Sequence, residues 1–252
     1  MESIFSRVFI SLTLIALTHQ TFAQITVATA ANMQFAMEEI ASLYRKESKE
    51  EVKIVTGASG KLAAQIRSGA PFDVFVSADL TYPDTIVKYG LAAGKTEVYA
   101  YGVLVLWTIK PLDLMKGLAL LSDPSIKKIA VGDLKLTVYG PAAQEAMQKA
   151  LVYENVKTKL VFGDNIPQVA QYIITGSADI GFNAKSIVLS APMAGKGRWV
   201  EVDRNLYKPI AQGAVILRHG KEHKSAAVEK FYAYLFGSSS RNVLTKYGYL
   251  LP

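Results

Sequence analysis

TGASGKLAAQIRSGAPFDVFVSAD, residues 56–79, joins the end of a strand, a loop of small residues, an amphipathic helix and a buried strand. Ala58, Ser59 and Gly60 stand where the helix is expected to begin. The first backbone N–H groups of a helix have no acceptor within the helix, so they and the Ser59 hydroxyl are available to an anion. An ordinary capped strand–helix junction has the same sequence pattern. The anion-binding interpretation therefore depends on whether the same pattern occurs elsewhere in the chain.

The pattern of a short apolar strand, a loop of small or polar residues and an amphipathic helix occurs three more times, in residues 25–45, 129–151 and 161–174. Asn32 is expected to cap the helix of the first repeat, and Pro141 and Pro167 suit the first helical turns of the other two. Strands that alternate with helices in this way predict an α/β protein with mostly parallel sheets. The carboxyl ends of parallel strands meet at one edge of a sheet, where α/β proteins bind their ligands.

The first 23 residues are typical of a cleaved secretory signal. Arg7 supplies a positive charge, residues 8–17 are mostly apolar, and Thr21-Phe22-Ala23 places small residues at the cleavage positions. The apolar run is about half of the ~20 residues that a membrane-spanning helix needs. We therefore expect cleavage after Ala23 and export of the chain that follows.

Composition narrows the possible functions. The 252 residues include no Cys, which excludes disulfides, thiolate metal ligands and Cys nucleophiles. The net charge of +7 is compatible with steering of a small anion, and no basic run with interleaved aromatic residues points to nucleic acid. His219 and His223 are four residues apart without an HExxH order, so we expect a solvated helix start there rather than a metal site.

Two lobes are expected from the apolar runs at residues 99–107 and 211–217, which are interpreted as crossover strands with hinges near Gly102 and Gly213. The first lobe would comprise residues 24–103 plus 214–252, and the second residues 104–213. Two interior strands of a single domain would have the same pattern, since periodicity does not separate the two cases.

Six stretches share their pattern with one known family: ITVATAANMQFAMEEIA (25–41), the segment 56–79, AVGDLKLTVYGPAAQEAM (130–147), GDNIPQV (163–169), ADIGF (178–182) and FYAYLFGSSSRNVLTKYGYLLP (231–252). With these stretches the chain resembles the type II periplasmic binding proteins that bind molybdate for ABC importers. The resemblance covers nearly all of the chain after residue 23. It implies two lobes, each with a mostly parallel sheet flanked by helices, joined by two crossover strands and closing over a tetrahedral oxyanion, with no catalysis and no cofactor.

The resemblance implies five binding positions: Ala31, Asn32, Ser59, Tyr139 and Ile166. The Asn32 amide and the Ser59 hydroxyl would donate hydrogen bonds, while Tyr139 and Ile166 would use their backbone N–H groups. A further family position, a Tyr hydroxyl in some members, falls on Phe182, which has none. The Tyr139 hydroxyl would replace it if the side chain turned inward. The alternative is a Tyr139 ring packed on the surface of its lobe.

The ligand implied by the resemblance is molybdate or tungstate, held by neutral hydrogen bonds without direct metal ligands. The partners implied are an inner-membrane ABC permease and its cytoplasmic ATPase, served by a monomer. Lys61 is expected to be solvated, and Asp164 to point outward from its loop. Phosphate near neutral pH carries a proton that needs an acceptor, so a site of donors alone should reject it.

Three alternatives stay open at this point. Sulfate is tetrahedral and fully deprotonated, so a sulfate or general oxyanion receptor fits the same residues. An enzyme on this scaffold is a different class, but the chain has no GxSxG motif and no paired acid and base at the four junctions. An adhesion or scaffold protein would leave four donor-rich helix starts unexplained.

Overall fold

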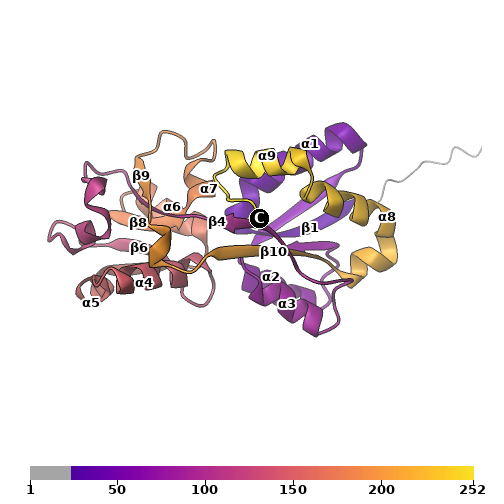
Figure 1. The fold of residues 1–252 in the computed structure, drawn as a ribbon, viewed down its shortest axis with the longest axis horizontal. Coiled ribbons are helices and arrows are strands. Elements are labelled where there is room, and N and C mark those ends of the chain that lie inside the picture. The colour runs from indigo at the N-terminus through magenta and orange to yellow at the C-terminus, as the bar shows by residue number, and fades with distance from the viewer. Residues whose placement is uncertain (1–23) are drawn as a thin grey trace, which may run out of the picture.

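Ten strands form two five-stranded sheets in the computed structural model, which describes residues 24–252 (Figure 1). The first sheet has the order β2 (Val52–Gly57), β1 (Ile25–Ala30), β3 (Val74–Val76), β10 (Ile210–Ile216) and β4 (Glu97–Gly102). The second has the order β7 (Leu160–Gly163), β6 (Ile129–Gly132), β8 (Ile180–Ala184), β5 (Leu104–Thr108) and β9 (Arg198–Glu201). The expected signal sequence and its cleavage site after Ala23 lie outside the described residues.

Each sheet is mixed, with four strands in one direction and one against them. In the first sheet, β1 runs parallel to β2 and β3, while β10 pairs antiparallel with β3 and β4. In the second, β6 runs parallel to β7 and β8, while β5 pairs antiparallel with β8 and β9. The predicted α/β class with two mostly parallel sheets is therefore confirmed.

Helices cover both faces of the first sheet: α1 (Gln34–Ser48), α8 (Arg218–Leu235) and α9 (Ser238–Lys246) on one, α2 (Ser59–Arg67) and α3 (Thr81–Lys88) on the other (Figure 1). Successive strand residues point to opposite faces, which creates two cores. Val74 and Val76 pack in the core under α1 and α8, whereas Phe75 packs in the core under α2 and α3.

One continuous core fills the second lobe around Trp107, Phe182 and Met147. Its helices are α4 (Tyr139–Lys149), α5 (Tyr153–Val156), α6 (Ile166–Ile174) and α7 (Lys185–Val188). Four 3-10 turns complete the described chain: η1 (Ala31–Met33), η2 (Leu114–Ser122), η3 (Lys157–Lys159) and η4 (Arg204–Leu206). Within the described residues, no helix is both long and apolar enough to cross a membrane.

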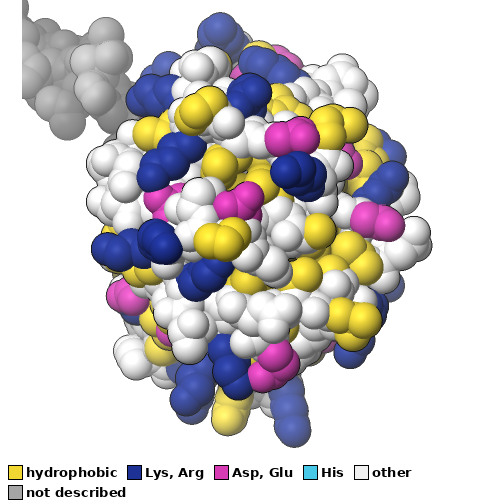
Figure 2. All heavy atoms as spheres, turned by 90° about the vertical axis from the view of Figure 1, so that its left-hand side faces the viewer, with side chains coloured by type: hydrophobic (Ala, Val, Ile, Leu, Met, Phe, Trp, Pro, Cys, Tyr) yellow, Lys and Arg dark blue, Asp and Glu magenta, His cyan; other side chains and the backbone are white. Residues whose placement is uncertain are grey.

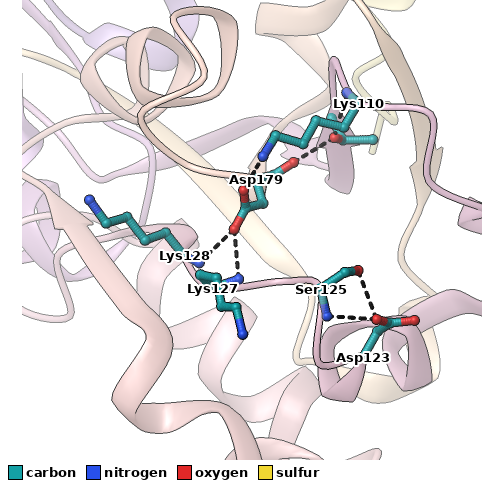
Figure 3. Close-up of polar contacts among 7 residues, drawn as sticks. Lys110, Asp123, Ser125, Lys127, Lys128 and Asp179 are labelled. Carbon is teal, nitrogen blue, oxygen red and sulfur yellow. Dashed lines mark hydrogen bonds and ion pairs between the residues drawn. The ribbon is translucent and has the colours of Figure 1, made fainter.

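Asp179 ties together the edge of the second sheet at which β6 and β8 begin (Figure 3). Its Oδ2 accepts the backbone N–H groups of Lys127 at 2.7 Å and Lys128 at 2.8 Å, and its Oδ1 pairs with the Lys110 amine. The loops after the other ends of β6 and β7 lead to α4 and α6. The Asp179 cluster therefore fixes the second sheet from the edge opposite those helix starts.

The far end of the second lobe faces the viewer in Figure 2. On this face Lys and Arg side chains are interspersed with Asp, Glu and hydrophobic side chains. The positive charge is thus mixed with other side chains on this face rather than gathered into one basic patch.

Two local expectations are corrected. The apolar run 99–107 crosses between the sheets, but as two strands rather than one, because β4 ends at Gly102 and β5 begins at Leu104. Asn32 does not cap α1: it lies in η1, and α1 begins at Gln34 without a side-chain cap, since the Asn32 amide bonds elsewhere. The helix expected within residues 129–151 begins at Tyr139, which places Pro141 in its first turn as expected, where a missing N–H costs nothing.

Candidate functional site

A cavity lies where four helical N-termini from the two lobes meet. All five predicted positions line it: Ala31, Asn32 and Ser59 from the first lobe, Tyr139 and Ile166 from the second. The volume open to the centre of a water molecule is about 20 Å³. A single buried water needs roughly 10–15 Å³ on this measure, so the cavity has room for one compact solute rather than for an extended organic molecule.

Backbone N–H groups at helix starts are the recurring donors around the cavity. Ser59, Tyr139 and Ile166 are the first residues of α2, α4 and α6, so no carbonyl of their own helix accepts their N–H groups. Each helix N-terminus also carries partial positive charge. Their convergence on one point makes a site suited to an anion.

The Ser59 side chain adds a hydroxyl donor. Its Oγ accepts the backbone N–H of Ala78 at 3.1 Å, and the residue is buried. Because a hydroxyl has one proton and two lone pairs, this contact leaves the proton free to donate. Ala78 also lines the cavity, which places the Ser59 hydroxyl at its wall.

Side-chain hydrogen bonds fix the two helix starts of the second lobe. Thr137 Oγ1 accepts the Gly140 N–H at 3.0 Å, at the start of α4. Asn165 Oδ1 accepts the Gln168 N–H at 2.9 Å, and the Asn183 amide donates to the Ile166 carbonyl at 3.2 Å, at the start of α6. The N–H groups of Tyr139 and Ile166 are therefore held in place independently of a ligand.

The lining carries no formal charge. Among the described residues that line the cavity there is no Asp, Glu, Lys, Arg or His. Burial raises the pKa of the Tyr139 phenol well above its usual value, so this hydroxyl stays protonated at neutral pH. The site consists of neutral hydrogen-bonding groups and apolar contacts.

A buried polar network that the sequence did not predict lies behind the lining. The Asn32 amide nitrogen donates to Gln212 Oε1 and to the Tyr249 hydroxyl, both at 3.1 Å. The Tyr139 hydroxyl accepts from Gln212 Nε2 at 3.1 Å and from Asn32 at 3.5 Å. The Tyr139 ring is thus buried between the lobes and is not packed on the surface of its lobe. Phe182, at the position of the missing family hydroxyl, is buried in the second core.

Two contacts join the lobes at the mouth of the cavity. The Tyr82 hydroxyl donates to the Lys135 carbonyl at 3.4 Å, and Tyr82 also lines the cavity. Lys61 and Asp164 form an ion pair at 3.5 Å, with side chains 58% and 60% exposed. Lys61 and Asp164 are largely solvated, as expected, but they face one another across the two lobes.

His219 and His223 lie at the start of α8, far along the chain from the cavity residues. His219 Nδ1 lies 3.0 Å from the buried Asp73 carboxylate and its ring stacks on His223. The described part of the chain holds no group of three or more His, Asp or Glu side chains arranged to hold a metal ion.

The comparisons with known proteins agree with this architecture. Residues 25–250 match the family described as bacterial extracellular solute-binding protein. The molybdate-binding protein of Azotobacter vinelandii is 38% identical over 229 residues, 90% of each chain. That of Rhodobacter capsulatus is also 38% identical over 229 residues, 90% of this chain and 88% of the relative.

A solved structure gives the same result in three dimensions. The periplasmic molybdate-binding protein of Azotobacter vinelandii superposes with a TM-score of 0.84 and 29% identity, over 91% of this chain and 100% of the other. The match spans both lobes and the crossover strands between them. The chain therefore belongs to the bacterial extracellular solute-binding proteins.

Proposed function

We propose that this protein captures molybdate or tungstate in the periplasm and delivers it to an ABC importer. The observation that carries the proposal is the small interlobe cavity, lined by helix N-termini and hydroxyl donors without a charged side chain. The relatives at 38% identity are named as molybdate-binding proteins, which supports the same ligand here.

Neutral donors are sufficient to hold a dianion in such a cavity. Hydrogen bonds to an ionised acceptor are about twice as strong as neutral ones, and they are strengthened in a low-dielectric interior. The starts of α4 and α6 are held by hydrogen bonds of Thr137, Asn165 and Asn183 before a ligand arrives. Little free energy is therefore spent on ordering these helix starts when the ligand binds. No bond to the metal atom is required.

The same donor set favours anions without a proton. Phosphate near neutral pH presents an O–H group that needs an acceptor, and leaving it unpaired costs about 1–3 kcal/mol. Asp164 is the acidic residue that precedes the Ile166 turn, but it pairs with Lys61 at the exposed mouth, which supports rejection of phosphate. Sulfate carries no such proton, so only its smaller size distinguishes it.

The mode of action we propose is capture by closure. The lobes, residues 24–103 plus 214–252 and residues 104–213, would close about hinges near Gly102 and Gly213 and then dock on the membrane permease with its ATPase. We further propose that the protein acts as a monomer after cleavage behind Ala23, without catalysis and without a cofactor. The relatives are solute-binding proteins, which supports a binding rather than a catalytic role.

A thermal-shift titration of residues 24–252, freed of ligand, with molybdate, tungstate, sulfate and phosphate tests the proposal. Ligand at about 100 times its dissociation constant adds about 2.7 kcal/mol, or roughly 5–10 °C for a chain of this size. We expect shifts with molybdate and tungstate alone. An equal shift with sulfate would favour a general oxyanion receptor, and no shift with any anion would contradict the oxyanion site.

A further inference from the structure

Gln212 is a fully buried polar residue at the boundary between the lobes. It belongs to β10 of the first sheet, and the register of β10 against β4 shifts between Gln212 and Gly213. Such a bulge redirects the neighbouring side chains. Gln212 is not among the residues that line the cavity, but its amide touches two that are, Asn32 and Tyr139.

Three hydrogen bonds fix the orientation of the Gln212 amide. Oε1 accepts from the Tyr99 hydroxyl at 2.7 Å and from the Asn32 amide at 3.1 Å, and Nε2 donates to the Tyr139 hydroxyl at 3.1 Å. The opposite orientation would set the Gln212 and Asn32 NH₂ groups against each other.

These bonds divide between the two sheets. Gln212 and Tyr99 belong to β10 and β4 of the first sheet, and Asn32 lies in η1, which follows β1 of that sheet, whereas Tyr139 is the first residue of α4, which follows β6 of the second sheet. The Gln212–Tyr139 bond therefore spans the boundary directly behind the cavity. The backbone of the same Tyr139 presents a predicted N–H donor to the ligand.

Gly102 gives independent evidence that this contact is built into the fold. A Cβ atom at Gly102 would lie 2.5 Å from Gln212 Nε2 and would overlap the Tyr139 hydroxyl. Glycine at the end of β4 thus leaves room for the phenol and the amide to meet. The Gln212 amide, the Tyr139 phenol and the Gly102 backbone therefore fit together when the two lobes are closed.

We propose that Gln212 is a positioning residue that couples closure of the lobes to assembly of the oxyanion site. In the closed form its amide holds the Tyr139 hydroxyl, and through it the start of α4, against Asn32 of the first lobe. The Tyr139 hydroxyl acts through this amide rather than by contact with the anion. This inference rests on the proposed function, because it concerns the same cavity.

A double-mutant cycle tests the coupling. Isothermal titration gives the Kd for molybdate of the wild type, Gln212→Met, Tyr139→Phe and the double variant, together with the unfolding midpoint of each without ligand. We expect each single change to weaken binding about tenfold, the usual scale of one lost buried hydrogen bond and the group it leaves unpaired. The double variant should lose little more than either single variant, since both remove the same contact.

Tyr232→Phe is the matched control. The Tyr232 hydroxyl of α8 donates at 2.9 Å to the Ala214 carbonyl of β10, the strand that also carries Gln212, but away from the cavity, so its removal should lower the midpoint and leave the Kd unchanged. A Gln212→Met protein with wild-type affinity would overturn the inference, and so would losses that multiply in the double variant. A wild type that binds no molybdate would instead contradict the proposed function, and the inference with it.

Discussion

Single residues set the character of the site through uncharged donors. Ser59 shows how one side chain does this: its hydroxyl oxygen accepts from Ala78, so its proton is left for the cavity. Tyr139 contributes in a second way: its backbone N–H is available to the cavity, while its side chain takes part in the hydrogen-bond network with Gln212 behind the cavity. Each donor is oriented by another hydrogen bond, which limits the ordering that binding requires.

Removal of the Ser59 hydroxyl tests whether this uncharged donor binds the anion. A hydrogen bond to a charged group contributes about 1.5–3 kcal/mol, so Ser59→Ala should weaken molybdate binding about 10- to 100-fold. Isothermal titration measures the change. Ser240→Ala is the control, because its buried hydroxyl donates to the Tyr234 carbonyl at 2.7 Å in another part of the lobe. Equal affinities for Ser59→Ala and the wild type would exclude the hydroxyl as a donor.

The resemblance predicted residues at strand–helix junctions and missed those that act at long range. Ala31, Asn32, Ser59, Tyr139 and Ile166 each stand at a strand–helix junction, and all five line one cavity. Gln212 and Tyr249 reach Asn32 across 180 and 217 positions of chain. Neither has a local pattern that marks it, so only the folded arrangement brings them to the site.

At the scale of elements, helix starts depend on how closely each helix approaches its strand. Gly140 is the second residue of α4, and a Cβ atom there would lie 2.8 Å from the Asp133 carbonyl oxygen and overlap that of Gly132. Both are backbone atoms, which cannot move aside as a flexible side chain can. The position of the Tyr139 N–H therefore depends on the absence of a side chain at the next residue.

We expect Gly140→Ala to lower the unfolding midpoint and to weaken molybdate binding, because α4 must shift away from β6. Gly237→Ala is the matched control, because Gly237 also stands at a helix start, directly before α9. Its added Cβ would meet nothing closer than the Tyr234 carbonyl at 3.2 Å. Thermal unfolding and titration of both variants measure the effects. A Gly140→Ala protein as stable and as tight-binding as Gly237→Ala would contradict the account of α4.

The opposite edge of the second sheet depends on a carboxylate. Burial alone raises the pKa of Asp179, but hydrogen bonds from the Lys110 amine and the Lys128 and Lys127 N–H groups outweigh it, so this pKa lies below its usual value. A lowered pKa stabilises the fold above the unfolded value of about 3.9, and the contribution is lost as the pH falls through the folded pKa.

Asp179→Asn should therefore lower the free energy of unfolding by about 1–3 kcal/mol near pH 7, the scale of a disrupted buried hydrogen-bonding group. The difference from the wild type should begin to shrink as the pH falls below the unfolded value of about 3.9, and its charge-dependent part should be lost only below the lowered folded pKa, where the wild-type carboxylate also becomes neutral. Urea unfolding at pH 7 and at a series of lower pH values measures the difference. A difference that stays constant over this series would show that the charge of Asp179 is not what stabilises this edge.

At the scale of the whole molecule, two lobes meet over a cavity that neither contains alone. The alternation of strands and helices, with the crossover run at residues 99–107, predicted the two sheets, but not that this run breaks into two strands at Val103, because periodicity does not mark where one strand ends. The exposed Lys61–Asp164 pair across the mouth contributes little by itself. Closure is therefore expected to depend on the ligand.

Small-angle X-ray scattering tests closure. The radius of gyration of the ligand-free protein should fall when molybdate is added, because the donors of both lobes are drawn around one anion. Sodium chloride at equal ionic strength is the control for screening of the surface charge. Identical scattering with and without saturating molybdate would mean that binding does not move the lobes.

The most direct test of the central claim is a crystal structure of the molybdate complex with anomalous scattering recorded at the molybdenum edge. The account predicts one strong anomalous peak in the interlobe cavity, within hydrogen-bonding reach of the Ser59 hydroxyl and of the Tyr139 and Ile166 N–H groups. A peak elsewhere on the protein, or an empty cavity in crystals grown with saturating molybdate, would contradict it.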